Sequence, residues 1–206
     1  PGPGRRWAGG RPGGGAGPGA GPRPRPASRA APRRAVGRVG LAPRAWRQAA
    51  RASPLRPSAS SARDRTAWAT AIDTWEQADA VLVGPAAAAG DTLRNRIYGW
   101  PQQAPCTIDQ DVLVHWNTPQ AYDIDTRFDN ARSLGAVEYL LHYTDATSSC
   151  PLPPNGWEAL GADRAKARCA LAATIAADVA ARATELELAW QPERGNYRGQ
   201  LVEAGT

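Results

Sequence analysis

The chain has 206 residues, enough for one domain or for one domain with a tail, and its formal charge of +6 is divided unevenly. Residues 1–65 hold fifteen Arg and one acid, a net of +14, whereas residues 66–206 hold ten Lys or Arg and eighteen Asp or Glu, a net of −8. The sequence has no run of about 18 apolar residues, the length that a transmembrane helix needs. It also has no uninterrupted apolar segment of about 7–15 residues, which a signal peptide would need.

Residues 1–62 form a low-complexity segment rich in Gly, Pro and Arg, as in Gly-Pro-Arg-Pro-Arg-Pro at 21–26. Without an apolar period they cannot bury enough surface to offset the entropy of ordering, so we expect a disordered basic tail. Such a tail can bind nucleic acid or anionic lipid through charge alone. Because Pro, Gly, Ala and Arg have GC-rich codons, we favour translated upstream sequence or a poorly called start over a native tail. We expect no nucleic-acid binding by the folded part.

Residues 63–206 are predicted to be an all-α, up-and-down bundle of four main helices, because no alternating apolar run indicates a strand. The first helix is expected over residues 66–83, where apolar residues recur at helical spacing before Gly84-Pro85. A second helix is expected over residues 91–98, with its first residue as N-cap. It ends before Trp100-Pro101, since a residue preceding proline avoids the helical region.

A short third helix is predicted over residues 108–116, with Thr107 as its N-cap. Two carboxylates, Asp109 and Asp111, fall in its first turn, where the helix dipole favours negative charge. The longest helix is predicted further along, from Trp157 to Trp190, and a last short one over residues 196–204.

Between these elements lies the most informative helix, which should start at Asp125 or Thr126 and end near Leu141. It places Glu138 in the middle of an otherwise apolar stretch. Burying a carboxylate is costly unless it is paired, hydrogen-bonded or bound to a metal. Glu138 is therefore either a metal ligand or a carboxylate that fixes helix register by bonding an arginine. The arginines considered are Arg94, Arg96 and Arg132.

The three cysteines do not have the spacing of a metal site. Cys106 and Cys150 lie in Pro-rich loops, and a disulfide between them fits an exported protein. The sequence leaves this pairing open against two reduced thiols. Cys169, on the longest helix, is expected to be a small apolar helix residue.

Four stretches together resemble the imelysin family, also called the M75 peptidase-like family. They are 75–85 (Trp-Glu-Gln-Ala-Asp-Ala-Val-Leu-Val-Gly-Pro), 95–101 (Asn-Arg-Ile-Tyr-Gly-Trp-Pro), 131–141, and the long helix ending in Ala189-Trp190. The resemblance covers residues 66–205 and matches the N-terminal half of the family, so it implies that a second helical half is missing. It also implies an exported periplasmic or outer-membrane-associated, lipoprotein-like protein linked to iron uptake.

Some members of that family are associated with a metallopeptidase activity attached to a G-x-H-x-x-E motif. Aligning this chain on Glu138 puts Ser133 at the Gly of the motif and Gly135 at its His. One carboxylate without the imidazole cannot hold a transition metal tightly, and a hydrolytic site usually needs three protein ligands. The motif is therefore degenerate, and we do not expect peptidase activity.

His142 follows Glu138 by four residues, so the two share a helix face and could together chelate iron or zinc. The alternative, which we favour for both His142 and His115, is a solvated histidine near a helix C-terminus, where the dipole favours a cation. Three acids before the motif helix could bind a hard cation, although capping and dipole partners are the simpler interpretation. These acids are Asp123, Asp125 and Asp129.

Four tryptophans lie in or beside the predicted helices: Trp75, Trp100, Trp157 and Trp190. They could form a ligand-stacking surface, but we interpret them as core residues. We assign Arg132 a structural role alongside Trp75, Trp100 and Trp190.

Three functions follow from these patterns. The one we favour is an imelysin-like cell-envelope protein associated with iron or metal acquisition and lacking peptidase activity. The alternatives are a metallopeptidase of the imelysin type and a non-catalytic module whose acidic bundle binds a partner protein. A metal ion, an envelope protein or the missing C-terminal half are the expected partners.

Overall fold

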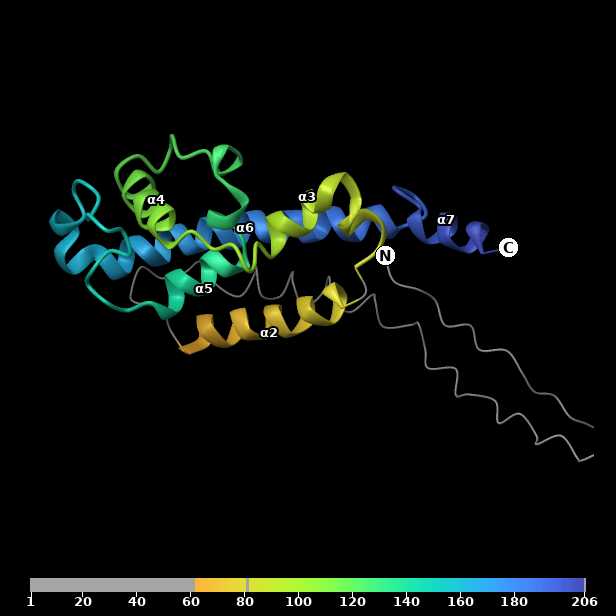
Figure 1. Ribbon diagram of the computed structural model, residues 1–206, viewed down its shortest axis with the longest axis horizontal. Helices are drawn as coiled ribbons and strands as arrows, with labels where there is room; N and C mark the ends of the chain where they lie inside the picture. Colours follow the sequence, from red (N-terminus) through yellow and green to blue (C-terminus); the bar gives the residue numbers. More distant parts are fainter. Residues whose placement is uncertain (1–61, 81, 206) are drawn as a thin grey trace, which may run out of the picture. The chain divides into compact units, whose positions relative to one another are not determined.

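The computed structural model describes residues 62–80 and 82–205 (Figure 1). These residues form six α-helices and four short 3₁₀ helices and contain no strand, so the all-α prediction is confirmed. The predicted tail, residues 1–62, lies outside the described residues except for its last member.

The first described helix, α2 (Ala62–Asp79), ends earlier than the predicted residue 83. Its Ala71 and Trp75 are buried, and it packs against α5. Trp68 fixes the helix along α5, since its indole Nε1 donates to the carbonyl of Leu134 at 3.0 Å. The aromatic spacing that predicted the helix therefore also positions it.

Helix α3 (Ala88–Ile97) follows the 3₁₀ helix η2 (Gly84–Ala86). Three of its first residues, Ala89 to Asp91, have left-handed backbone angles, so regular helical geometry begins only at Thr92. Asp91, whose φ is 61°, directly precedes this regular part, and its role as N-cap stays a prediction.

Helix α4 (Pro105–Asn117) begins three residues before the predicted start at 108. Proline is well suited to the first turn, where its missing N–H has no helical partner. Thr107 is consequently inside the helix and is not its N-cap. Asp109 and Asp111 lie beyond the first turn and face inward, with exposed fractions of 0% and 3%, so their prediction as first-turn dipole partners is wrong.

Helix α5 (Leu134–His142) is much shorter than predicted. The segment expected to begin it instead forms two 3₁₀ helices, η3 (Ile124–Thr126) and η4 (Asp129–Ala131). Extended residues at Phe128 and Ser133 interrupt any continuous helix. Six of the nine residues of α5 are buried, which makes it the central element of the core.

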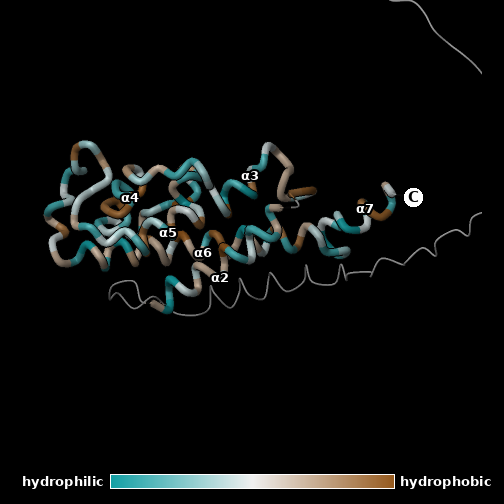
Figure 2. Tube along the Cα trace, turned by 60° about the horizontal axis from the view of Figure 1, so that its bottom comes forward, coloured by the Kyte–Doolittle hydropathy of each residue, from teal (hydrophilic) through white to brown (hydrophobic). Residues whose placement is uncertain are grey.

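Helix α6 (Arg164–Trp190) is the longest element and packs against α3, α4 and α5 (Figure 1). The predicted single helix from Trp157 is interrupted, because η5 (Glu158–Asp163) contains Gly161 with a left-handed φ of 48°. Helix α7 (Tyr197–Ala204) follows. Apolar stretches of α4 and α6 line the core beside α5 (Figure 2).

Candidate functional site

Glu138 is half-buried on α5, and its hydrogen-bond partner is Gln103, whose Nε2 donates to Oε2 at 3.5 Å. The arginine partners considered from the sequence bond other carboxylates. Arg94 pairs with Asp79, while Arg96 and Arg132 bond carboxylates near η3 and η4. The carboxylate in the motif is thus bonded by a neutral amide.

The amide of Gln103 fits against α5 because Gly135 has no side chain. A Cβ at this position would lie 2.6 Å from Nε2 of Gln103 and 3.1 Å from its Cδ. A similar close approach occurs two residues earlier, where Ser133 packs against Gly99. A Cβ on Gly99 would lie 2.7 Å from that of Ser133. Both motif positions that depart from the G-x-H pattern are therefore packed against neighbours that fit the residues present.

His142, at the end of α5, is exposed and contacts the Trp68 ring edge-on, with ring centroids 5.3 Å apart. Across the part of the chain that the structure describes, no three or more His, Cys, Asp or Glu side chains are grouped so that they could hold a metal ion. The donor set around Glu138 therefore does not fit a three-ligand transition-metal site. Metal binding by Glu138 and His142 stays a prediction.

The three acids before α5 serve as caps and ion-pair partners. Asp123 accepts the backbone N–H of Asp125 at 2.9 Å. Asp129 accepts from Arg132 Nη2 at 2.7 Å, and Arg132 also donates to the Ile124 carbonyl at 2.9 Å. Arg132 is buried, and its bonds to Ile124 and Asp129 join η3 to η4.

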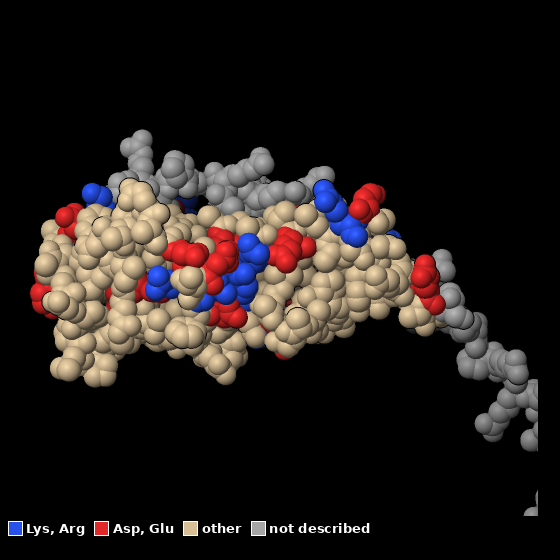
Figure 3. Space-filling model, turned by 90° about the horizontal axis from the view of Figure 1, so that it is seen from above, with Lys and Arg blue, Asp and Glu red and all other residues tan. Residues whose placement is uncertain are grey.

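Arg96 joins this region to α6. It bonds Asp125, which lowers the pKa of that carboxyl, and it reaches Asp178 at 3.4 Å. Asp178, nearly buried on α6, is also 3.3 Å from Arg182. Figure 3 shows acidic and basic side chains intermixed on one face of the molecule. Since these charges are paired with one another, the ion pairs tie α3, η3 and α6 together.

The tryptophans differ in burial. Trp75 and Trp157 are core residues, with exposed fractions of 3% and 0%. Trp190 is half-buried against Tyr197. Trp100, expected in the core, is 54% exposed and stacks on Tyr98 with ring centroids 6.3 Å apart.

His115 is buried, so its prediction as a solvated histidine is wrong. Its Nε2 lies 2.9 Å from Thr174 Oγ1 on α6, and the edge of its ring meets Tyr122. Burial lowers the pKa of His115. The neutral ring therefore belongs to the interface between α4 and α6.

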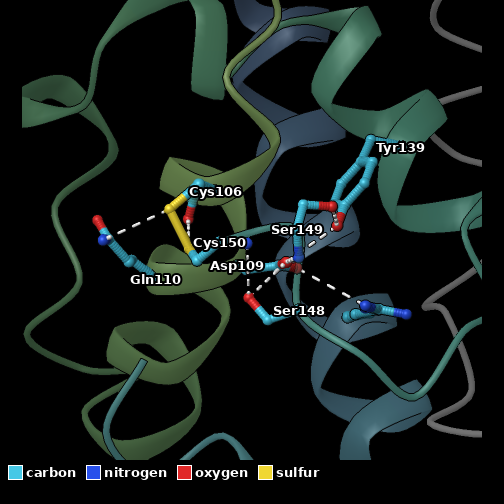
Figure 4. The surroundings of a disulfide bond; sticks show 8 residues. Cys106, Asp109, Gln110, Tyr139, Ser148, Ser149 and Cys150 are labelled. Atoms are coloured by element: carbon cyan, nitrogen blue, oxygen red, sulfur yellow. Dashed lines mark hydrogen bonds and ion pairs between the residues drawn. A yellow bond between two sulfur atoms is a disulfide. The ribbon is translucent and has the colours of Figure 1, made fainter. Parts of the chain in front are cut away.

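Asp109 of α4 is a fully buried carboxylate with four polar partners (Figure 4). Its Oδ2 accepts three hydrogen bonds, from Tyr139 Oη at 3.0 Å, Ser148 Oγ at 3.1 Å and the backbone N–H of Ser149 at 2.7 Å. Burial raises the pKa of Tyr139, so its phenol stays protonated and can donate. The second carboxylate oxygen faces Arg168 at 3.7 Å.

Arg168 of α6, 3% exposed, is the partner of the loop that follows α5. We call residues 143–150 the strap. Arg168 Nη1 donates to the carbonyls of Tyr143 and Asp145, each at 2.9 Å, and Nη2 donates to Thr147 at 3.4 Å. One guanidinium thus binds alternate carbonyls of the strap.

A disulfide joins Cys106, at the start of α4, to Cys150, at the end of the strap, 44 residues later (Figure 4). Cys169 of α6 lies outside this bond and is buried. It lines a cavity of about 350 Å³ between the strap and α6. The strap is therefore held at one end by a covalent bond and along its length by buried polar groups.

Sequence reasoning missed Asp109 and Arg168, although a signal was present. Asp109 is followed at three and four residues by the buried Val112 and Leu113, and Arg168 has Leu171 at the same spacing. A charged residue in register with an apolar helix face is expected to be buried and paired. The interpretation of Asp109 as a dipole partner concealed this pattern.

A family model described as imelysin, peptidase M75, matches residues 42–205. The match begins before residue 63, the predicted start of the folded part, and its first residues lie outside the described ones. No curated protein and no solved structure matches the chain. Among the described helices, none combines the length and apolar character needed to cross a membrane.

Proposed function

Because the chain belongs to the imelysin family, we propose that it is a non-hydrolytic, imelysin-like protein of the cell envelope that takes part in iron or metal acquisition by binding. The observation that carries this proposal is the pairing of Gln103 with Glu138 over Gly135. An amide donor satisfies the carboxylate where the family motif has an imidazole. Glu138 then fixes the packing of the segment before α4 on α5.

Two further features support the proposal. Disulfides persist in oxidising compartments such as the periplasm, and the Cys106–Cys150 bond fits such a location. The link to iron rests on family membership. It predicts that the transcript rises when the source cells are grown with an iron chelator, and an unchanged transcript would count against this part of the proposal.

Hydrolysis is tested with unfolded casein as substrate, in the presence of Zn(II) or Fe(II). We expect the parent chain and Glu138→Ala to release peptides at the same background rate. Metal-dependent cleavage by the parent that is lost in Glu138→Ala would overturn the proposal and establish the metallopeptidase alternative.

Metal binding is tested by calorimetry with Fe(II), Fe(III) and Zn(II). The variants are Glu138→Ala and His142→Ala, and Asp73→Ala on the exposed face of α2 is the matched control. Micromolar binding lost in the first two variants but kept in the control would show that the chain binds the metal directly through this face. Binding that none of them changes, or no binding, would place Glu138 in a structural role.

The second candidate function is a protein-interaction module, which the exposed aromatic residues favour. Trp100 is 54% exposed and Phe128 is 75% exposed, although solvent exposure of such large apolar side chains is unfavourable. A metal-free chain that captures an envelope protein through Trp100, and loses it in Trp100→Ala, would favour this function.

A further inference from the structure

We propose that the Cys106–Cys150 disulfide is a redox-sensitive latch, whose reduction by a dithiol releases the strap and uncovers Arg168 and Cys169 on α6. The inference is independent of metal acquisition, since it rests only on how the strap is attached.

The strap is attached through polar groups that water can replace and through the Tyr143 ring, which stacks on Tyr139 of α5 with ring centroids 5.0 Å apart. Arg168 binds three of its carbonyls, and Trp157 Nε1 donates to a fourth, that of Ala146, at 3.0 Å. Asp109 accepts from Ser148 and Ser149. The disulfide is the covalent anchor at the end of this segment.

The apolar core does not depend on the strap. The hydrophobic cluster is built from α2, α3, α4, α5, α6 and their connections, and it contains none of residues 143–149. The side chains from Thr144 to Thr147 are exposed. When the strap separates from the helices, water reaches Asp109 and Arg168 and replaces the hydrogen bonds that they made to the strap. The helices keep their apolar contacts.

The two cysteine residues differ in exposure, because Cys106 is half-buried and Cys150 is 9% exposed. A thiolate of the reductant therefore attacks Cys106 Sγ, forms a mixed disulfide and expels Cys150 as a thiolate, which takes up a proton. The second thiol of the reductant then attacks the reductant's sulfur in the mixed disulfide, and Cys106 leaves as a thiolate that is also protonated. Two electrons and two protons pass to the protein, and the dithiol is oxidised to a disulfide.

Cys169 reports this opening. It is 3% exposed and shares the cavity of about 350 Å³ with Tyr143, Thr144, Asp145 and Ala146 of the strap. The chain has three cysteines, so with the disulfide intact Cys169 carries its only thiol. Its rate of alkylation measures how often the strap is open.

The first experiment compares alkylation of Cys169 by N-ethylmaleimide in the oxidised full chain and in the double variant Cys106→Ser/Cys150→Ser. We expect at least a tenfold faster reaction in the variant at equal helix content by circular dichroism. Cys169→Ser in the oxidised chain must remain unlabelled. Equal rates in the parent and the double variant would overturn the proposal.

The second experiment keeps the natural sequence and so does not depend on the variant folding. Hydrogen exchange is followed by mass spectrometry in the full chain with and without dithiothreitol. We expect reduction to speed exchange of the amides of residues 143–150 by a larger factor than that of the amides of α5 and α6, whose protection falls only with the global stability. An equal loss of protection in the strap and in α6 would show that the strap opens only when the whole fold unfolds, and unchanged exchange of the strap would show that it is no latch. Either result overturns the proposal.

Discussion

At the scale of single residues, Asp109 and Arg168 form a buried ion pair whose hydrogen bonds extend into the strap. Replacing Asp109 by alanine leaves the guanidinium buried without its carboxylate and removes the acceptor for two strap residues. We expect Asp109→Ala to lower the free energy of unfolding by about 3–5 kcal/mol. Urea denaturation measures the change.

The matched control is Asp73→Ala, at an exposed position of α2, which should change the free energy of unfolding by less than about 0.5 kcal/mol. Asp109→Asn keeps the shape and one acceptor oxygen, so its loss should be smaller than that of the alanine variant. A loss for Asp109→Ala as small as that of the control would contradict the prediction.

His115 predicts a pH dependence of stability. Burial lowers its pKa in the folded chain below the usual value of 6.5. As the pH falls through this value, the unfolded chain binds a proton that the folded chain does not yet bind, so the free energy of unfolding decreases. The decrease stops once the folded histidine is also protonated.

Urea denaturation at pH values of about 7.5 and about 5.5 tests this. The loss of stability on acidification should be larger in the parent than in His115→Gln, and His142→Gln, at an exposed position, should behave as the parent. Burial also raises the pKa of Asp111, one turn before His115, which stabilises the fold as the pH falls. Because this contribution is common to all three chains, the difference between them isolates His115.

At the scale of elements, Gly99 sets how closely the segment after α3 approaches α5. Its φ is 67°, and a Cβ there would lie 2.7 Å from Ser133 Cβ and 3.1 Å from the Asp129 carbonyl oxygen. Gly99→Ala should therefore combine a left-handed backbone penalty of about 1–2 kcal/mol with an overpacking penalty of about 1–3 kcal/mol.

Gly90→Ala is the control, because Gly90 has a φ of 69° but nothing within 4 Å of the added Cβ. It should show only the backbone penalty. The difference between the two variants, measured by thermal or urea denaturation, gives the packing contribution. Equal losses would mean that Ser133 moves aside without cost.

The elements themselves were predictable to different degrees. Repeated apolar spacing correctly indicated α2 and most of α6, because a long amphipathic helix leaves a period in the sequence. The start of α5 was not predictable from the same rule. Asp125 and Thr126 have the side chains of a helix start, but the backbone is extended at Phe128 and Ser133, and no spacing in the sequence marks these two breaks.

The partners of the candidate site residues could not be predicted from sequence spacing either. The sequence singled out Glu138 and considered an arginine partner. Gln103 is 35 residues away and has no spacing relation to Glu138. The importance of Asp109 likewise comes from Ser148, Ser149 and Arg168, which approach it only in the folded chain.

At the scale of the whole molecule, α6 packs on α3, α4 and α5, while the disulfide closes the chain across α4, α5 and their connections. A cross-link between residues 44 apart restricts the unfolded chain. We expect Cys106→Ser/Cys150→Ser to lower the free energy of unfolding by about 2–4 kcal/mol and to raise the urea m-value, since the unfolded chain can expand further.

Dithiothreitol should reproduce this loss in the parent and leave the double variant unchanged. An equal free energy of unfolding for the parent with and without reductant would show that the restriction of the unfolded chain is offset in the folded state. This measurement concerns global unfolding, whereas alkylation of Cys169 concerns opening of the strap alone.

The way in which the strap is anchored also bears on how its sequence can evolve. Arg168 and Trp157 donate hydrogen bonds to main-chain carbonyls of the strap, and Arg168 also lies over the Tyr143 ring. The side chains of Thr144, Asp145 and Ala146 are exposed. Substitutions at these three positions therefore leave the anchoring bonds in place. Natural sequence variation can therefore accumulate at these three positions without loss of the main-chain hydrogen bonds. Homologous proteins can differ in surface chemistry here while they keep the same fold.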